Sequence, residues 1–192
     1  MNTAFGCNGS TIRLSSGAYL DLLNPDPQLI TLRDVSRGLA NICRFGGQCD
    51  VFYSVAEHSL ACAGLAHERQ MSRAVQLACL MHDAAEAFIG DVVKPLKILI
   101  EPLYGPIEQK VEAAIAAAFG VDFVSTRDDW KRVDQIMLIA ERRALFTPDK
   151  VTWTGENEVE RIRYQPRFLN PFYAAMEFES AFRLLTAERV AS

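Results

Sequence analysis

The chain has 192 residues, of which 49% are hydrophobic, and its formal net charge is −4. These values allow one globular domain with a full core and exclude an intrinsically disordered chain. The acidic balance argues against a partner that is a nucleic-acid polymer or an anionic membrane surface. No uninterrupted apolar stretch approaches the ~20 residues of a membrane span.

The cysteines and the first residues bear on the cellular compartment. The five cysteines are odd in number and include no Cys-x-x-Cys pair, so neither a disulfide framework nor a zinc ribbon is expected. Cys62 and Cys79 lie in apolar stretches, where a thiol is typically a small buried hydrophobe. Residues 1–6 lack the basic segment and apolar run of a secretory signal. We therefore expect a reduced, cytoplasmic setting.

The first part of the chain differs from the rest. Residues 11–14 and 18–22 flank a Ser-Ser-Gly turn and predict a small hairpin, which a proline-rich loop follows. Two strands alone are marginally stable, so we expect residues 1–30 to lie across a helical body.

The middle of the chain predicts three helices with recognisable first residues. Thr31 and Asp34 form a capping-box pattern before an apolar stripe that extends to about residue 42. Ser54 and Glu57 form a second one, which opens a helix to about residue 66. Ser72 caps a helix that we expect to run to about residue 88.

The last part of the chain predicts further helices. Pro95 starts a short helical turn, and an alanine-rich helix over residues 106–119 ends at Gly120. A long helix starts at Ser125 or Thr126 and ends near residue 146, and Asn170 opens a final helix to about residue 185. Residues 148–169 have no clear period, which is typical of a functional, interfacial or mobile segment. The sequence thus predicts a single all-α domain over residues 1–192.

Polar residues interrupt three of the apolar helices. They are His58, the His82-Asp83 pair and Asp134, each flanked by apolar positions. Buried imidazoles and carboxylates need a compensating charge, and a divalent cation binds both types of side chain. If the helices pack together, four such ligands leave two octahedral positions for a water and a substrate oxygen. His67 is nine residues after His58, about half a turn out of phase, and should point away.

A second interpretation of the His82-Asp83 pair is a helix end that faces water, with Gly90 as the stop signal. The dipeptide alone does not decide between the two. Three polar interruptions in three helices favour one common explanation, which is a metal site.

The joint pattern resembles the HD-domain metal-dependent phosphohydrolases. The resemblance is strongest to bacterial 5′-deoxynucleotidases, to which phage deoxynucleoside triphosphate triphosphohydrolases are related. The similar segments are Arg44-Phe45, Glu57-His58-Ser59, His82-Asp83-Ala84-Ala85-Glu86, Gly90-Asp91, Pro95-Leu96-Lys97 and Lys131-Arg132-Val133-Asp134. The resemblance covers about residues 32–143, and the family usually has Trp where this chain has Phe45.

The resemblance implies an all-helical HD-domain bundle, a homo-oligomer and one catalytic metal ion. The implied ligands are His58, His82, Asp83 and Asp134. Mixed nitrogen and oxygen ligands suit Mn²⁺, Co²⁺, Fe²⁺, Ni²⁺ or Zn²⁺.

Glu86 is the implied catalytic residue. It would position the attacking water or move its proton. The alternative is that it only forms a hydrogen bond to a ligand histidine.

Other residues are implied to bind the substrate. Arg44, Lys97 and Lys131 would bind phosphate, and each also has the alternative of a solvated surface residue. Asp91 would accept a hydrogen bond from a sugar 3′-hydroxyl, or else cap the helix that follows. Phe45 and Pro95 would flank the sugar or base, although a lone phenylalanine is more often part of a core.

The predicted function is a 5′-deoxynucleotidase that converts a deoxynucleoside monophosphate to a deoxynucleoside and phosphate. One alternative is a triphosphohydrolase of the dATP type, for which Arg142, Arg161 or Arg163 would supply additional cations. Another is a metal-stabilised nucleotide-binding module without turnover, and a third is a purely structural helical protein. The Glu141-Arg142-Arg143 cluster is expected to be solvated or to face another subunit.

Overall fold

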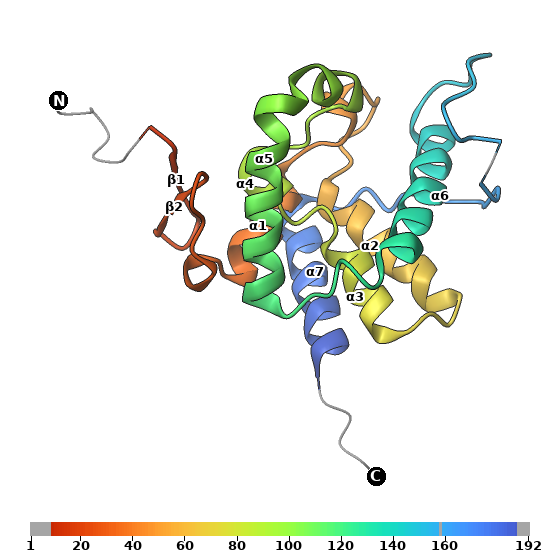
Figure 1. The fold of residues 1–192 in the computed structure, drawn as a ribbon. Coiled ribbons are helices and arrows are strands. Elements are labelled where there is room, and N and C mark those ends of the chain that lie inside the picture. Colours follow the sequence, from red (N-terminus) through yellow and green to blue (C-terminus); the bar gives the residue numbers. More distant parts are fainter. Residues whose placement is uncertain (1–8, 158, 188–192) are drawn as a thin grey trace, which may run out of the picture.

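The computed structural model describes residues 9–157 and 159–187, and it confirms the all-α prediction with a small N-terminal hairpin (Figure 1). Residues 1–8, which include Cys7 and the segment inspected for a secretory signal, lie outside the described residues. The helices are α1 (Leu32–Asn41), α2 (Val55–Glu68), α3 (Arg73–Met81), α4 (Glu86–Ile89), α5 (Lys94–Phe119), α6 (Arg127–Leu145) and α7 (Pro171–Thr186).

The last helix occupies the middle of the bundle. Helix α7 packs against α1, α2 and α3, and α6 packs against α2 and α3 (Figure 1). The buried Phe178 and Ala174 of α7 join the main core, whose members come from most of the helices. A smaller cluster of buried residues joins α2, α3 and α6. Val133 and Ile136 of α6 belong to this second cluster. They lie on either side of Asp134 in the sequence, so the cluster borders one of the predicted metal ligands.

The hairpin consists of β1 (Thr11–Arg13) and β2 (Tyr19–Asp21), which pair in antiparallel register. Leu14 and Leu20 are buried in the main core, so the hairpin is attached through its apolar side chains. Asp34 of α1 adds polar contacts, since its Oδ1 accepts hydrogen bonds from Ser15 Oγ at 2.8 Å and Ser16 N at 2.7 Å. The same carboxylate completes the predicted capping box with Thr31.

The helix predicted from Ser72 to about residue 88 is wrong in its second half. Helix α3 ends at Met81, residues 82–85 form turns, and the short α4 begins at Glu86. In this turn the backbone N–H groups bond to the carbonyl three residues earlier, instead of four as in an α-helix. The two hydrogen bonds run from Ala84 N to Met81 O and from Glu86 N to Asp83 O. The His82-Asp83 pair therefore lies in a turn between two helices.

The separation of a short turn at Pro95 from a helix over residues 106–119 is also wrong. A single helix, α5, runs from Lys94 to Phe119 and contains Pro102 and Pro106. The fixed φ of proline is compatible with a helix, and the cost is a missing backbone hydrogen bond. Gly120 closes the helix as predicted, with a left-handed φ of 66°.

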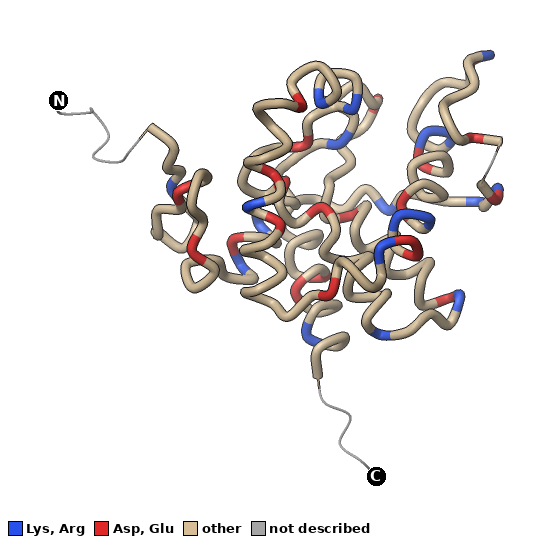
Figure 2. Tube along the Cα trace, viewed as in Figure 1, with Lys and Arg blue, Asp and Glu red and all other residues tan. Residues whose placement is uncertain are grey.

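Residues 148–169 form no helix or strand in their described part, in line with the prediction. Their second half is nevertheless attached to α2, because Glu57 accepts hydrogen bonds from the backbone N–H groups of Arg167, Phe168 and Leu169. Acidic and basic residues are interspersed over the described chain (Figure 2). No helix among the described residues combines the length and hydrophobicity that crossing a membrane requires.

Candidate metal centre

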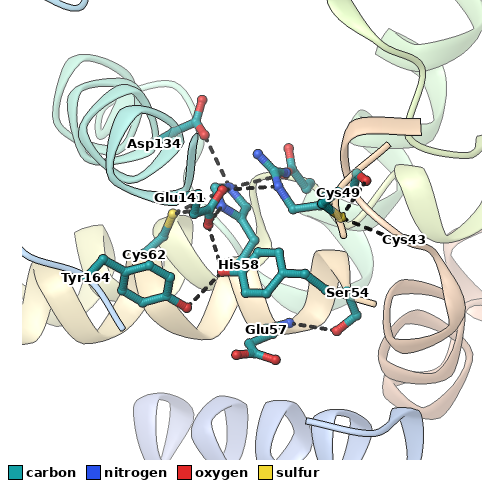
Figure 3. Close-up of polar contacts among 12 residues, drawn as sticks. Cys43, Cys49, Ser54, Glu57, His58, Cys62, Asp134, Glu141 and Tyr164 are labelled. Atoms are coloured by element: carbon teal, nitrogen blue, oxygen red, sulfur yellow. Dashed lines mark hydrogen bonds and ion pairs between the residues drawn. The ribbon is translucent and has the colours of Figure 1, made fainter. Parts of the chain in front are cut away.

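The four residues predicted to bind a metal come together in the structure. His58 is on α2, Asp134 is on α6, and His82 and Asp83 are in the turn after α3. The Nε2 atom of His58 lies 3.3 Å from Nε2 of His82, 3.2 Å from Asp134 Oδ1 and 3.5 Å from Asp83 Oδ2. Figure 3 shows Asp134 pointing from α6 toward His58.

The remaining distances fit the coordination shell of one ion. His82 Nε2 lies 3.3 Å from Asp83 Oδ2 and 3.6 Å from Asp134 Oδ1. Ligand atoms bound at about 2.1 Å to one ion are separated by about 3.0 to 3.4 Å between neighbours, for octahedral and tetrahedral arrangements respectively. The donor atoms of the two histidines and two aspartates are therefore spaced as neighbouring ligands are.

Hydrogen bonds at Nδ1 fix the orientation of the His58 and His82 imidazoles. His82 Nδ1 is 2.8 Å from the carbonyl oxygen of Cys79, which can only accept, so Nδ1 carries the proton. His58 Nδ1 is 2.6 Å from Glu141 Oε1, a carboxylate oxygen. When the two rings are neutral, as metal binding requires, the lone pair of each is on Nε2, and the two Nε2 atoms face each other and two carboxylates. A cation between them would offset the repulsion of these donors.

The histidines and carboxylates of the site change one another's pKa. Burial alone would raise the pKa of Asp134, but hydrogen bonds and charge from His58 and His82 hold that pKa well below its usual value. Burial would lower the pKa of His82, and Asp83 and Asp134 outweigh it, so this pKa is raised. The side chains thus form a site in which two carboxylates require nearby positive charge.

A cysteine also contacts the group. The thiol of Cys62 lies 3.5 Å from His58 Nε2, and ligand atoms of His58, Cys62, His82 and Asp134 all lie within 4.8 Å of one another. This buried group could hold a metal ion. Cys62 and Cys79 are fully buried, as predicted, but Cys62 contacts a polar group and is not surrounded by apolar atoms alone. His67 is exposed, in agreement with its expected direction away from the site.

Glu86 is buried at the start of α4, and its Oε2 has no hydrogen-bond partner among the described residues. Burial raises the pKa of this carboxyl well above its usual value. Asp83 and Asp91 raise it further, whereas Arg44 and Lys97 act in the opposite direction. Glu86 therefore holds a proton more readily than an exposed glutamate does, which favours a role in proton transfer.

The predicted substrate-binding residues Arg44, Phe45 and Asp91 lie beside the centre. Arg44 Nη1 is 3.2 Å from Asp83 Oδ2, and the carboxylate of Asp91 accepts a hydrogen bond from the backbone N–H of Phe45. Phe45 has a φ of 59°, unusual for a residue other than glycine. The alternative role of Asp91 as a helix cap is wrong, since the N-cap of α5 is Val93 and no side chain caps it.

The aromatic ring of Phe45 is half-buried against two other aromatic rings. Its centroid lies 5.1 Å from that of Phe146 and 6.2 Å from that of Trp153. These neighbours come from the end of α6 and the irregular segment, so the segment contributes a wall beside the Arg44 loop.

The remaining candidates are Lys97, Pro95 and Lys131, and the two lysines have neighbours other than the donor atoms in the described chain. Lys97 Nζ forms an ion pair of 2.6 Å with Glu108, and Pro95 is exposed in the first turn of α5. Burial would lower the pKa of Lys97, but Glu108, Glu86 and Asp83 raise it, so its ammonium lies in the field of the site. The exposed Lys131 lies over the Trp130 ring at 5.7 Å, and that ring lies 5.5 Å from the ring of His82.

The prediction of a solvated or subunit-facing Glu141-Arg142-Arg143 cluster is wrong for Glu141 and Arg142, whereas Arg143 is exposed. Glu141 is fully buried and contacts His58 Nδ1, while Arg142 is buried and pairs with Glu156 and Asp149 at 2.6 Å each. The missed signal was the position of Glu141 two helical turns after Asp134, which places both on one face of α6. Burial would raise the pKa of Glu141, but His58 and Arg44 lower it.

Comparison with family models produced no match. The chain is 39% identical over 146 residues to YfdR of Escherichia coli, a protein named as uncharacterized, and the match covers 75% of this chain and 77% of YfdR. It is also 32% identical over 158 residues to the uncharacterized protein RCAP_rcc00048 of Rhodobacter capsulatus, with 80% of this chain and 79% of that protein covered. At this identity and coverage, the chain belongs to the same protein family as YfdR.

Proposed function

We propose that this protein is an HD-domain phosphohydrolase that uses one divalent metal ion and acts on deoxynucleotides. The preferred reaction is that of a 5′-deoxynucleotidase, which releases phosphate from a deoxynucleoside 5′-monophosphate. The observation that carries the proposal is the convergence of His58, His82, Asp83 and Asp134 near a buried Glu86, whose Oε2 has no hydrogen-bond partner among the described residues.

The donor set suits Mn²⁺, Co²⁺, Fe²⁺, Ni²⁺ or Zn²⁺, because imidazole and carboxylate ligands are combined. A divalent cation held there would supply Lewis-acid polarisation of a phosphoryl oxygen and of the attacking water. The protein's part is to fix the direction of each ligand through the contacts of its own residues.

Glu86 would serve as the catalytic acid and base. It is buried, its pKa is raised, and one carboxylate oxygen is free of protein partners in the described chain. It would take a proton from the attacking water and return one to the 5′-oxygen of the leaving nucleoside.

Arg44 is the best supported phosphate ligand. Its contacts use Nη1 toward Asp83 and Nε toward Glu141, which leaves the Nη2 donors for a phosphate oxygen. Lys97 and Lys131 would approach from α5 and α6, and binding by Lys97 requires exchange of its present partner Glu108. Asp91 would accept from the sugar 3′-hydroxyl, and Phe45 and Pro95 would line the nucleoside side.

The monophosphate reaction is preferred to triphosphate hydrolysis for one structural reason. A triphosphate needs cations for its additional phosphate groups, and Arg142 was one candidate. Its guanidinium is bound by Glu156 and Asp149. Arg161 and Arg163 are exposed and could bind additional phosphate groups, so the triphosphohydrolase is the second candidate. The Glu86 Oε2 atom, which lacks a hydrogen-bond partner in the described part of the chain, favours an enzyme over a binding module without turnover.

The decisive test measures phosphate and tripolyphosphate release from deoxy- and ribonucleoside mono- and triphosphates with each candidate metal. We expect phosphate release from deoxynucleoside monophosphates. A Glu86→Gln variant should retain the metal and lose about 10²–10⁴-fold in kcat. Tripolyphosphate as the product would establish the second candidate. Absence of both products with every metal, or a fully active Glu86→Gln variant, would refute the proposed mechanism.

Homo-oligomer formation and a cytoplasmic location remain part of the proposal. Exposed apolar side chains on α5, including Ile98, Leu99 and Leu103, are compatible with a subunit contact. Sedimentation of the purified protein would establish the number of subunits.

A further inference from the structure

Glu141 connects the candidate metal centre to two other parts of the fold. Its Oε1 accepts a hydrogen bond from Tyr53 Oη at 2.8 Å and lies 2.6 Å from His58 Nδ1. Its Oε2 lies 3.3 Å from Nε of Arg44. Glu141, Tyr53 and His58 are all fully buried. Figure 3 shows Glu141 reaching from α6 toward His58, with Tyr164 and Cys62 to their left.

The contact with His58 determines where that imidazole has its lone pair. An ionised carboxylate can only accept, so the proton of this hydrogen bond is on Nδ1. The lone pair of the neutral ring is then on Nε2, the atom that faces His82 and Asp134. Without the carboxylate, the ring would be free to place a proton on Nε2, where it would exclude a cation.

Two tyrosines hold Glu141 in turn. The single hydroxyl proton of Tyr53 is donated to Glu141, so the Tyr53 oxygen accepts the hydroxyl proton of Tyr164 at 2.9 Å. Tyr164 belongs to the irregular segment between α6 and α7. A continuous set of hydrogen bonds therefore joins this segment to a candidate metal ligand.

We propose that Glu141 is a positioning residue of the metal centre, which holds His58 with Nε2 directed at the cation, and that Tyr53 and Tyr164 hold Glu141. The proposal rests on the metal centre of the proposed function and is independent of the reaction catalysed there. A competing explanation is that Glu141 only neutralises the buried Arg44. The two differ in what they predict for metal affinity.

The test compares Glu141→Gln with Glu57→Gln, a matched exchange of another buried glutamate. The Glu57 carboxylate accepts from the backbone of residues 167–169 and has no described contact with the donor atoms. Titration calorimetry with Mn²⁺ and Co²⁺ should show that Glu141→Gln weakens metal affinity about 10–100-fold. Glu57→Gln should lower the melting temperature and leave metal affinity unchanged. Equal affinities of a folded Glu141→Gln variant and the parent would overturn the proposal.

Two further measurements avoid a variant that fails to fold. Tyr53→Phe removes one hydroxyl from Glu141 and should weaken metal binding less than Glu141→Gln does. Ring-nitrogen NMR of the unaltered protein loaded with Zn²⁺ should show a slowly exchanging proton on His58 Nδ1. The chain has only three histidines, and the exposed His67 provides an internal reference. Coordination of Zn²⁺ through Nδ1 of His58 would contradict the proposal directly.

The outcomes also separate this proposal from the proposed function. A protein that binds metal and loses affinity in Glu141→Gln, yet hydrolyses no nucleotide, would refute the phosphohydrolase and support the role of Glu141. Nucleotide hydrolysis by the parent, together with an unchanged metal affinity in Glu141→Gln, would support the phosphohydrolase and refute the role of Glu141. A parent protein that binds no divalent metal would refute both.

Discussion

Asp134 and Glu141 of α6 contact opposite nitrogens of the same imidazole, that of His58. Asp134 Oδ1 lies 3.2 Å from Nε2, and Glu141 Oε1 lies 2.6 Å from Nδ1. Two carboxylates two turns apart on one helix thus hold a ring from a second helix. The arrangement explains why a fully buried histidine is tolerated between α2 and α6.

Metal binding should stabilise the fold. The donor atoms come from α2, α6 and the turn after α3, so an ion bound only by the native state shifts the unfolding equilibrium. At a free metal concentration of 100 times Kd, the free energy of unfolding should rise by about 2.7 kcal/mol. Thermal unfolding with Mn²⁺ or Zn²⁺, followed by chelator, measures this. A melting temperature that changes with neither the metal ion nor the chelator would contradict this prediction.

Replacing Arg44 should destabilise the protein. Arg44 is buried between Asp83 and Glu141, and Arg44→Gln would leave the fully buried Glu141 and the partly buried Asp83 without this counter-charge. Removing one partner of a buried ion pair typically costs about 3–5 kcal/mol. Chemical denaturation of the metal-free protein gives the value. Arg183→Gln is the control, since Arg183 is exposed in its pair with Glu179 and should change stability little.

Gly38 and Gly64 offer a matched pair of helix glycines. A Cβ at Gly38 of α1 would lie 2.7 Å from both Cβ and the carbonyl oxygen of Ala87, whereas a Cβ at Gly64 of α2 would meet nothing within 4 Å. Gly38→Ala should therefore cost about 1–3 kcal/mol and displace α4, which contains Glu86. Gly64→Ala should stabilise by up to about 1 kcal/mol, because alanine is the better helix former. Equal effects in denaturant unfolding would show that α1 and α4 are not in close contact.

Asp34 should make stability depend on acidic pH. Burial would raise the pKa of Asp34, but hydrogen bonds from Thr31, Ser16 and Ser15 outweigh it and lower that pKa. Because the folded-state pKa is depressed, the stabilisation is present above the unfolded pKa of about 3.9 and is lost as pH falls through the lower, folded value.

An Asp34→Asn variant tests this dependence. It should be less stable than the parent by about 1 kcal/mol at neutral pH, as expected for a weakened helix cap. The difference in stability between the parent and Asp34→Asn should shrink as the pH falls below the ordinary pKa of an aspartate. Asp26→Asn, at the exposed cap of the short 3-10 helix Pro27–Leu29, is the control. A difference that stays constant with pH would refute the assignment.

The sequence was sufficient for what depends on local patterns. Capping residues such as Thr31, Ser54 and Ser72 and the glycine at position 120 predicted where helices begin and end. The break after Met81 could not be predicted, because Ala, Leu and Met favour a helix and the turn depends on the tertiary position of His82. Glu141 was misjudged for a related reason, since two following arginines suggested a solvated cluster, while its burial depends on contacts with α2.

The central claim is that side chains from three parts of the chain hold one metal ion. The most direct measurement is the metal content of protein loaded with Co²⁺ and separated from free metal, for the parent and for Asp134→Ala. Asp134 lies on α6, apart in sequence from the other donors, and is half-exposed, so its removal should leave the fold intact. We predict one Co²⁺ per parent chain and almost none in Asp134→Ala. Equal metal content in the two proteins, or no retained metal in the parent, would contradict the account.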